Sequence, residues 1–304
     1  MFDILVAGEI NPDLVLSGNV EPTFDQVEKL VDSAVITIGS SSAIFACGAA
    51  RLGLKVAFIG VCGDDIFGRF MLDEMSKRDV NVENVLCIPG GATGFGVTLT
   101  RGADRAILTY PGLISALKAG DLSDGLLRQA RHLHVASYFL HTALQPGLPG
   151  LFERAHALGL TTSLDTNYDP TGQWLGLDIL LTHTDIFMPN EIEACSLART
   201  KDIDLAVDRL AGRLETLVVK LGAKGALAVR GRQKFTADPI PVNVVDTVGA
   251  GDGFDAGFMY GYLNGWPLEK MLKMAVVCGA LSTRSAGGTP AQATLEETRQ
   301  YDIG

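Results

Sequence analysis

Residues 246 to 258 read Asp-Thr-Val-Gly-Ala-Gly-Asp-Gly-Phe-Asp-Ala-Gly-Phe, and this stretch carries more information than any other part of the chain. A β-rich segment, Pro239 to Val245, leads into it, and a helical pattern follows, with Phe254, Phe258 and Tyr262 on one face. Glycines let the backbone turn tightly and bring its N–H groups close to a ligand. A helix start adds unpaired N–H donors and the positive end of the helix dipole. The stretch therefore predicts an anion site of the kind that holds a phosphate.

Asp252 lies inside this predicted site, and its carboxylate has two interpretations. An aspartate at a helix start often caps the helix, and an isolated Gly-x-Gly-Asp indicates a cap more often than a catalytic group. A carboxylate in a phosphate site is also a suitable general base, because it can take a proton from a hydroxyl that then attacks phosphorus. The residues of the stretch alone leave both interpretations open.

Composition limits the class of protein. The chain has 304 residues, 47% of them hydrophobic and 20% charged, which is enough for one large core. Its formal charge of -10 argues against nucleic acid as a partner, since a phosphate backbone requires a basic face. It contains no apolar run of membrane-spanning length and no N-terminal signal pattern, so we expect no membrane association. The five scattered cysteines form no Cys-x-x-Cys pair, which favours reduced thiols and a cytoplasmic location.

The order of patterns along the chain predicts the fold class. Helical and strand patterns alternate from Leu122 onward, beginning with a predicted helix at Leu122 to Arg131, and this favours a doubly wound, mostly parallel α/β sheet flanked by helices. Two earlier β-rich segments interrupt the alternation. We therefore expect a single domain, residues 1–304, with insertions at about 12–38 and 88–111 forming a small β-sheet lid. Ligands of such folds bind at the carboxyl ends of the strands.

The string Asp-Thr-x-Gly-Ala-Gly-Asp resembles the C-terminal signature of the PfkB/ribokinase family of carbohydrate kinases. Ala50-Arg51-Leu52-Gly53 is similar to part of the family's N-terminal signature, and matched elements follow in the expected order from Asn11 to Gly288. The resemblance implies a ribokinase-like fold and an ATP-dependent phosphotransferase that phosphorylates a hydroxyl of a small sugar or sugar-like alcohol. It also implies that Asp252 is the general base and that the backbone of Gly249, Ala250 and Gly251 forms the anion hole.

The resemblance assigns the acceptor site to an early turn and to the lid. The turn at Gly39, Ser40 and Ser41 lies over the sugar in the family, and Asp13 would accept hydrogen bonds from two hydroxyls of the acceptor. This chain departs from the family at Ser40, where a second glycine is usual, and at Ile44, where an asparagine often holds a sugar hydroxyl.

Two further residues are assigned to the acceptor. Arg105 falls in a predicted lid strand, and Tyr138 lies where an aromatic face would cover the C–H surface of a sugar. Of the histidines, His132 and His134 sit in a predicted strand without a third ligand at metal-like spacing, which favours a structural role.

The nucleotide and its cations are assigned to the second half of the chain. Asn190 and Glu193 match the family's Asn-x-x-Glu motif, which organises Mg²⁺ and the ATP phosphates, a cation usually bound through few carboxylates and many waters. The resemblance implies a K⁺ site as well. The residues assigned to the nucleotide are Asn190, Lys220, Gly222, Gly225 and Thr247, and the residue assigned to the monovalent cation is Asp246.

The acceptor and the activity leave alternatives. One alternative is a nucleoside or sugar-phosphate acceptor, because Ile44 replaces the usual asparagine. A sugar phosphate would need a cation to hold its own phosphate, but the candidate cations, Lys29, Arg101 and Arg105, are expected to be solvated. A non-catalytic sugar- or nucleotide-binding regulator is another, against which the intact Asp252 counts. The exposed face of a lid sheet can pair with another subunit, so a homodimer is a further hypothesis.

Overall fold

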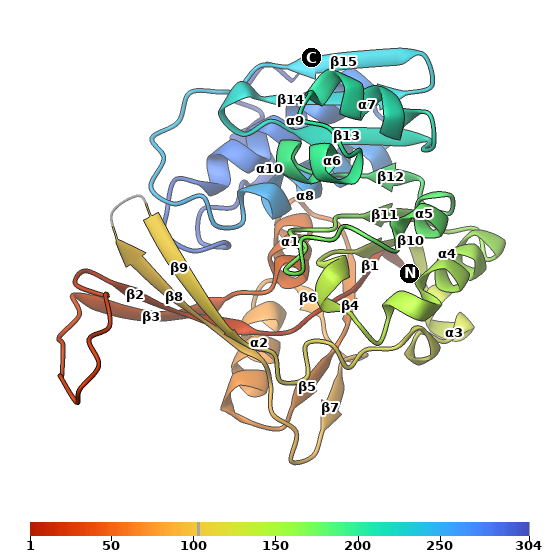
Figure 1. The fold of residues 1–304 in the computed structure, drawn as a ribbon. Helices are drawn as coiled ribbons and strands as arrows, with labels where there is room; N and C mark the ends of the chain where they lie inside the picture. Colours follow the sequence, from red (N-terminus) through yellow and green to blue (C-terminus); the bar gives the residue numbers. More distant parts are fainter. Residues whose placement is uncertain (102–103, 304) are drawn as a thin grey trace.

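The computed structural model describes residues 1–101 and 104–303, together with the side chains of these residues except Asp104 and Arg105. Within this part of the chain, nine strands form a central sheet (Figure 1). In spatial order they are β15 (Gln233–Ala237), β14 (Ala226–Arg230), β13 (Thr216–Lys220), β12 (Ile186–Phe187), β11 (Thr161–Leu164), β10 (Ala130–Val135), β1 (Phe2–Ala7), β4 (Val56–Ile59) and β6 (Val80–Asn81). The pairs from β13 to β6 are parallel, and β14 and β15 add an antiparallel edge.

Helices cover both faces of the central sheet, so the predicted doubly wound architecture is confirmed. One face packs against α1 (Ser41–Arg51), α2 (Ile66–Ser76), α8 (Ala250–Leu263) and α9 (Leu268–Ser282), and the short α10 (Leu295–Thr298) lies against α9. The other face packs against α3 (Asp124–Leu127), α4 (Leu148–Ala157), α5 (Leu177–Leu181), α6 (Glu191–Leu197) and α7 (Ile203–Ala211). Residues 4 to 7 of β1 form an unbroken apolar run because Ile4 and Val6 enter one core while Leu5 and Ala7 enter the other.

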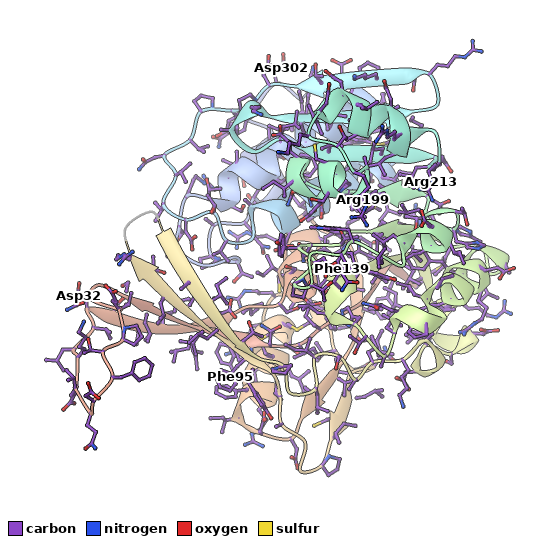
Figure 2. The ribbon with its side chains drawn as sticks, in the orientation of Figure 1. Asp32, Phe95, Phe139, Arg199, Arg213 and Asp302 are labelled. Atoms are coloured by element: carbon purple, nitrogen blue, oxygen red, sulfur yellow. The ribbon has the colours of Figure 1, made fainter. Side chains whose placement is uncertain are left out.

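The predicted small separate sheet is also present. Its strands are β3 (Ser33–Ile38), β2 (Pro12–Ser17), β8 (Phe95–Arg101) and β9 (Asp104–Tyr110), in that spatial order. The sheet extends away from the helices, with Phe95 at its inner end and Asp32 near its outer end (Figure 2). A separate parallel pair joins β5 (Val61–Gly63) to β7 (Leu86–Ile88).

Strand register gives the small sheet two different faces, because side chains alternate across a strand. The register pairs Asp13 with Thr37 and Gly96, so these residues share one face. It pairs Leu14 with Ile36 and Val97, and Val97 with Leu108, so the opposite face is apolar. We call the first the polar face and the second the apolar face of the small sheet.

Two predicted elements are wrong. Residues 239–245 form no strand, since Pro239 and Pro241 lack the N–H donors that a ladder needs. The helix predicted at 122–131 is limited to Asp124–Leu127. The residues at 130 and 131 begin β10 instead, where pairing with β1 overrides their local preference. No helix in residues 1–101 and 104–303 is both long enough and apolar enough to cross a membrane.

Candidate active site

The start of α8 is built around a backbone conformation that favours glycine. Gly249, the residue before the helix, has a φ of +74°. A Cβ added there would lie 2.6 Å from Gly288 Cα and 3.0 Å from Ile44 Cγ2. Any side chain at this position would therefore clash with the backbone of Gly288 and crowd the buried side chain of Ile44. The carboxylate of Asp246 fixes the turn from outside, because its two oxygens accept from Val248 N (3.0 Å) and Gly287 N (2.9 Å).

The donors of this helix start are partly engaged. Ala250 N donates to Thr247 O at 3.2 Å, whereas the N–H groups of Gly251 and Asp252 belong to a first helical turn, which has no carbonyl of its own helix to reach. Of the predicted anion hole, Gly249 N and Gly251 N have no hydrogen-bond partner among the described residues, and Gly251 N is the one that belongs to the first helical turn. The site can receive an anion at the positive end of the α8 dipole.

Asp252 lies in this first turn with only 7% of its surface exposed. Burial raises the pKa of its carboxyl well above the usual value, the Asp165 carboxylate raises it further, and Lys220 acts in the opposite direction. The nearby Ser41 side chain also acts to lower the pKa of this carboxyl. Because Ser41 begins α1, which packs beside α8 (Figure 1), the predicted acceptor turn and the predicted base lie close together.

A buried cluster of charged side chains lies near Asp252. Lys220 Nζ is 2.7 Å from Asp165 Oδ2 and 3.1 Å from Asp255 Oδ2, and a Cβ on Gly251 would lie 3.6 Å from the same nitrogen. Burial alone would lower the pKa of Lys220, but the adjacent carboxylates raise it overall. Burial raises the pKa of Asp255. Burial also opposes ionisation of Asp165, but the charge of Lys220 and hydrogen bonds to the carboxylate together lower the pKa of Asp165. The two carboxyls that share Lys220 thus have pKa values displaced in opposite directions, that of Asp165 downward and that of Asp255 upward.

Asn190 and Glu193 form a reciprocal cap at the start of α6. Asn190 Oδ1 accepts from Glu193 N at 2.9 Å, while Glu193 accepts from Asn190 N (2.8 Å) and Asn190 Nδ2 (2.6 Å). Glu193 is buried, and burial followed by the charge of Asp165 raises its pKa to about 7. Strand pairing places Asn190 beside Lys220, so the motif adjoins the charge cluster.

The acceptor residues gather at the inner end of the small sheet. A Cβ on Gly39 would lie 2.4 Å from Asp13 Oδ1, and one on Gly96 would lie 2.3 Å from it, so two glycines make room for this carboxylate. Ser40 Oγ donates to Glu9 O (2.6 Å) and accepts from Ala43 N (2.9 Å). The hydroxyl of Ser40 is thus used as the cap of α1.

Glu9 is a buried site residue that the sequence did not reveal. Its carboxylate accepts from Ser42 Oγ (2.6 Å), Ser42 N (3.2 Å), Ser137 Oγ (3.0 Å) and His141 Nε2 (3.2 Å). Burial opposes ionisation, but the hydrogen bond and charge of His141, followed by Ser42, lower the pKa of Glu9 to about 2. Asn167 joins the cluster by donating to Ser137 Oγ at 2.8 Å. A signal was available, since Glu9 lies two residues after the end of the first strand, at the carboxyl edge where ligands bind.

Other predicted residues lie apart from this cluster. Tyr138 donates its hydroxyl to Gly176 O at 3.1 Å within a hydrophobic core. Gly222 and Gly225 have positive φ in the turn between β13 and β14, and Thr247 is exposed. The side chain of Arg105 falls outside the described residues.

The predicted structural role of His132 and His134 agrees with their surroundings. Both are buried, and both bond Ser163 Oγ at 2.7 Å. Burial lowers the pKa of each, that of His134 to about 3, so the rings are neutral. Phe45 stacks on His134 with ring centroids 3.8 Å apart.

A cation fits this site only in part. Among the described residues, no group of three or more histidine, cysteine, aspartate or glutamate side chains could hold a metal ion. Mg²⁺ does not need such a cage, because it usually takes one or two carboxylates and fills its remaining positions with water and substrate phosphates. Asp165, Asn190 and Glu193 carry oxygen atoms of the kind that Mg²⁺ prefers, and they lie around Lys220.

The fold and the site together define a ribokinase-like phosphotransferase architecture, and comparison with known proteins agrees with it. The model of the pfkB family carbohydrate kinases matches residues 1–295. The chain is 28% identical over 285 residues to 5-dehydro-2-deoxygluconokinase of Geobacillus thermodenitrificans, covering 87% of this chain and 83% of the relative. It is 26% identical over 310 residues to ribokinase of Haemophilus influenzae, covering 98% and 97%.

Solved structures share the fold. A candidate ribokinase II from E. coli, in complex with ATP and Mg²⁺, has a TM-score of 0.88 at 23% identity, covering 99% of this chain and 98% of that one. The chain belongs to the pfkB family of carbohydrate kinases, and it is therefore an enzyme of that class.

Proposed function

We propose that the protein transfers the γ-phosphoryl group of ATP to a hydroxyl of a small, unphosphorylated sugar or sugar-like alcohol. The observation that carries the proposal is the buried carboxyl of Asp252 in the first turn of α8, which packs beside α1, the helix that begins in the acceptor turn at Ser41. A base in this position adjoins both a phosphate site and an acceptor site. ATP is supported by family membership and by the bound ATP of the similar E. coli protein.

The proposed mechanism uses each group of the site once. Asp13 and the turn at Gly39 hold the acceptor, and Asp252 removes the proton from its hydroxyl as that oxygen attacks the γ-phosphorus. The bond from phosphorus to the bridging oxygen breaks, and ADP leaves. N–H donors at the start of α8, Gly251 above all, stabilise the charge on the transferred group.

Lys220 contributes positive charge to the proposed anion site. Its ammonium, held by Asp165 and Asp255, lies close to the Gly251 backbone and adds positive potential under the anion site. Asn190 and Glu193, with Asp165, would hold Mg²⁺ through water, and the cation would neutralise phosphate charge when bound. Asp246, which joins the 247 turn to Gly287, is the proposed side-chain contact of a K⁺ ion.

The small sheet is the proposed lid, formed by the insertions at about 12–38 and 88–111. Its polar face carries Asp13 and the buried Thr98, so closure would cover the acceptor and exclude water from the reaction. Its apolar face is the proposed surface of a homodimer, because Ile36, Leu108 and Tyr110 are 43%, 62% and 48% exposed. We keep a cytoplasmic location as part of the proposal, supported by five free cysteines.

The alternative acceptors have less support. Arg101 pairs with Glu21 and lies about 16 Å along β8 from Gly96, at about 3.3 Å per residue, and Lys29 bonds Glu21 O. These cations are therefore poorly placed to hold a second phosphate near Asp13. Ile44 and Phe45 are buried in packing, against Gly288 and His134, and so provide no open cleft for a nucleoside base.

The test is ADP release from Mg-ATP with a panel of sugars, polyols, sugar phosphates and nucleosides. The proposal predicts strong stimulation by one or a few unphosphorylated sugars or polyols. Stimulation by sugar phosphates or nucleosides alone would overturn the acceptor class. Tight binding of ATP and a sugar without any turnover would favour a regulator.

A further inference from the structure

Cys62 and Cys87 face each other across the parallel pair of β5 and β7. The strand register makes them direct partners, so their side chains point to the same side. Neighbouring strands lie about 4.8 Å apart, and a disulfide needs a Cα–Cα separation of about 4.4 to 6.8 Å. The backbone therefore already holds the two residues within bonding range, while both thiols are free in this structure.

The two thiols differ in their access to solvent. Cys62 is fully buried, and Cys87 is exposed. Burial raises the pKa of Cys62 to about 12, and the adjacent Cys87 thiol raises it further, which supports their close approach. A dissolved oxidant therefore reaches the Cys87 thiol first, whereas the Cys62 thiol is shielded from solvent.

The remaining cysteines offer no such pair. Cys47 and Cys278 are buried in helices α1 and α9, and Cys195 is half-buried in α6. None of these helical residues has a cysteine as a strand partner. The pair at 62 and 87 is thus distinguished by geometry and by exposure together.

We propose that Cys62 and Cys87 form an oxidation site, which closes to an intramolecular disulfide on reaction with a hydroperoxide. The Cys87 thiolate attacks one peroxide oxygen, the O–O bond breaks, and the departing oxygen takes up a proton, which leaves a sulfenic acid on Cys87. The Cys62 sulfur then attacks the Cys87 sulfur, and the S–O bond breaks. The hydroxyl leaves with the Cys62 proton as water. Two thiols supply the two electrons that reduce the peroxide.

The local structure permits the small movement that this bond needs. The two Cβ atoms must approach to about 3.8 Å, and all three residues of β7 are exposed, so this strand can shift towards β5. β5 is anchored, because Gly63 N donates to Thr93 Oγ1 at 2.9 Å and Thr93 bonds Asp65. The disulfide would join this anchored strand to the segment that leads into β8.

The test uses the full-length reduced protein, treated with graded hydrogen peroxide and mapped by mass spectrometry after blocking free thiols under denaturing conditions. We expect a peptide pair joined through Cys62 and Cys87, reversed by dithiothreitol, and formed equally in a Cys195→Ser control. Cys62→Ser should instead leave a sulfenic acid on Cys87 that reacts with a 1,3-diketone probe. Cys87→Ser should leave Cys62 reduced under the same treatment.

Three results would overturn the proposal. One is oxidation of Cys87 to a sulfinic acid while Cys62 remains free for alkylation. Another is a disulfide between two molecules through Cys87. The third is a 62–87 product that appears no faster than oxidation of the control thiols. The readout is chemical and needs no turnover, so its failure is independent of the proposed kinase activity.

Discussion

Two buried carboxyls of the site, those of Glu9 and Asp252, have pKa values displaced in opposite directions. Glu9 accepts four hydrogen bonds, from Ser42, Ser137 and His141, and these favour its charged form over the cost of burial. At Asp252 burial and the charges of Asp165 and Glu9 raise the pKa more than Lys220 and Ser41 lower it. Glu9 is thus suited to hold structure, and Asp252 to carry a proton.

Glu9→Gln tests this difference through the pH dependence of stability. The pKa of Glu9 is about 2 in the folded protein against 4.5 as its ordinary value, so its charged form stabilises the fold above pH 4.5. This stabilisation is lost as the pH falls from 4.5 towards 2. The stability difference between wild type and Glu9→Gln should therefore shrink by about 1 kcal/mol between pH 5.5 and 3.5.

Urea denaturation at a series of pH values measures that difference. The exposed Glu153→Gln is the matched control, and its difference from wild type should stay constant over the same range. If the stability difference between wild type and Glu9→Gln also stays constant with pH, Glu9 has an ordinary pKa in the folded protein.

Prediction at the residue scale depended on how local each signal was. Asp252 and Ser41 lie in sequence patterns with a known local geometry, and each lies in the first turn of a helix, in α8 and α1, which pack side by side. Asp255 was missed as a partner of Lys220, because that ion pair joins residues 35 positions apart in the chain. Tyr138 was assigned to the acceptor by residue type, yet its hydroxyl bonds Gly176 O in the core. A side chain's direction depends on packing that a single sequence does not display.

At the scale of elements, the start of α8 depends on close approach between backbones. Gly249 lies against Gly288, and the loop around residue 287 is tied to Asp246. The Gly-Ala-Gly turn is therefore held between α1 and that loop and has little freedom to adapt. Preorganised donors of this kind stabilise developing charge without reorganising during the reaction.

Gly249→Ala and Gly265→Ala separate backbone strain from loss of this packing. Both glycines have positive φ, +74° and +68°, so alanine costs about 1 to 2 kcal/mol at either position. A Cβ at Gly265 meets nothing within 4 Å, whereas one at Gly249 clashes with Gly288. Gly265→Ala should lower the free energy of unfolding by that amount and keep turnover. Gly249→Ala should cost more stability and also lower kcat by at least tenfold.

Chemical denaturation and steady-state kinetics on the two variants provide the comparison. Equal effects on kcat would indicate that the turn before α8 tolerates movement, contrary to its proposed role.

Elements with a strong local signal were predicted well, as for the helix that follows Gly249, α8 at Ala250–Leu263, and for the separate small sheet. The failures have a common cause. Residues 130 and 131 joined β10 because β1 offered hydrogen-bond partners, and residues 239–245 lost strand structure because prolines removed donors. In both places, long-range pairing or its absence decided the outcome.

At the scale of the whole molecule, the strand register of the small sheet gives its two faces different proposed roles. The polar face presents Asp13 to the site, and the apolar face presents Leu14, Ile36, Val97 and Leu108 outward. The sequence predicted the sheet but not which residues share a face, because that depends on how four separate strands align. The proposed lid and the proposed dimer surface thus belong to opposite sides of one sheet.

Leu108→Asp tests the dimer surface, with Ile107→Asp as its control. These neighbours are 62% and 54% exposed and lie on opposite faces of β9. A buried charge at an apolar interface is costly, so Leu108→Asp should weaken self-association by at least tenfold, while Ile107→Asp should change it little. Analytical ultracentrifugation measures both. Monomeric wild type at high concentration, or an equal effect of the two variants, would argue against this surface.

The central claim is that Asp252 lies between the acceptor site and the phosphate site and removes the proton from the acceptor hydroxyl. The most direct test is the kcat of Asp252→Asn with the acceptor identified from the panel, measured beside ATP affinity and melting temperature. Asparagine keeps the shape and removes the base, so the account predicts that kcat falls by about a thousandfold while ATP binding and folding are retained. A variant that folds, binds ATP and turns over within tenfold of wild type would contradict it.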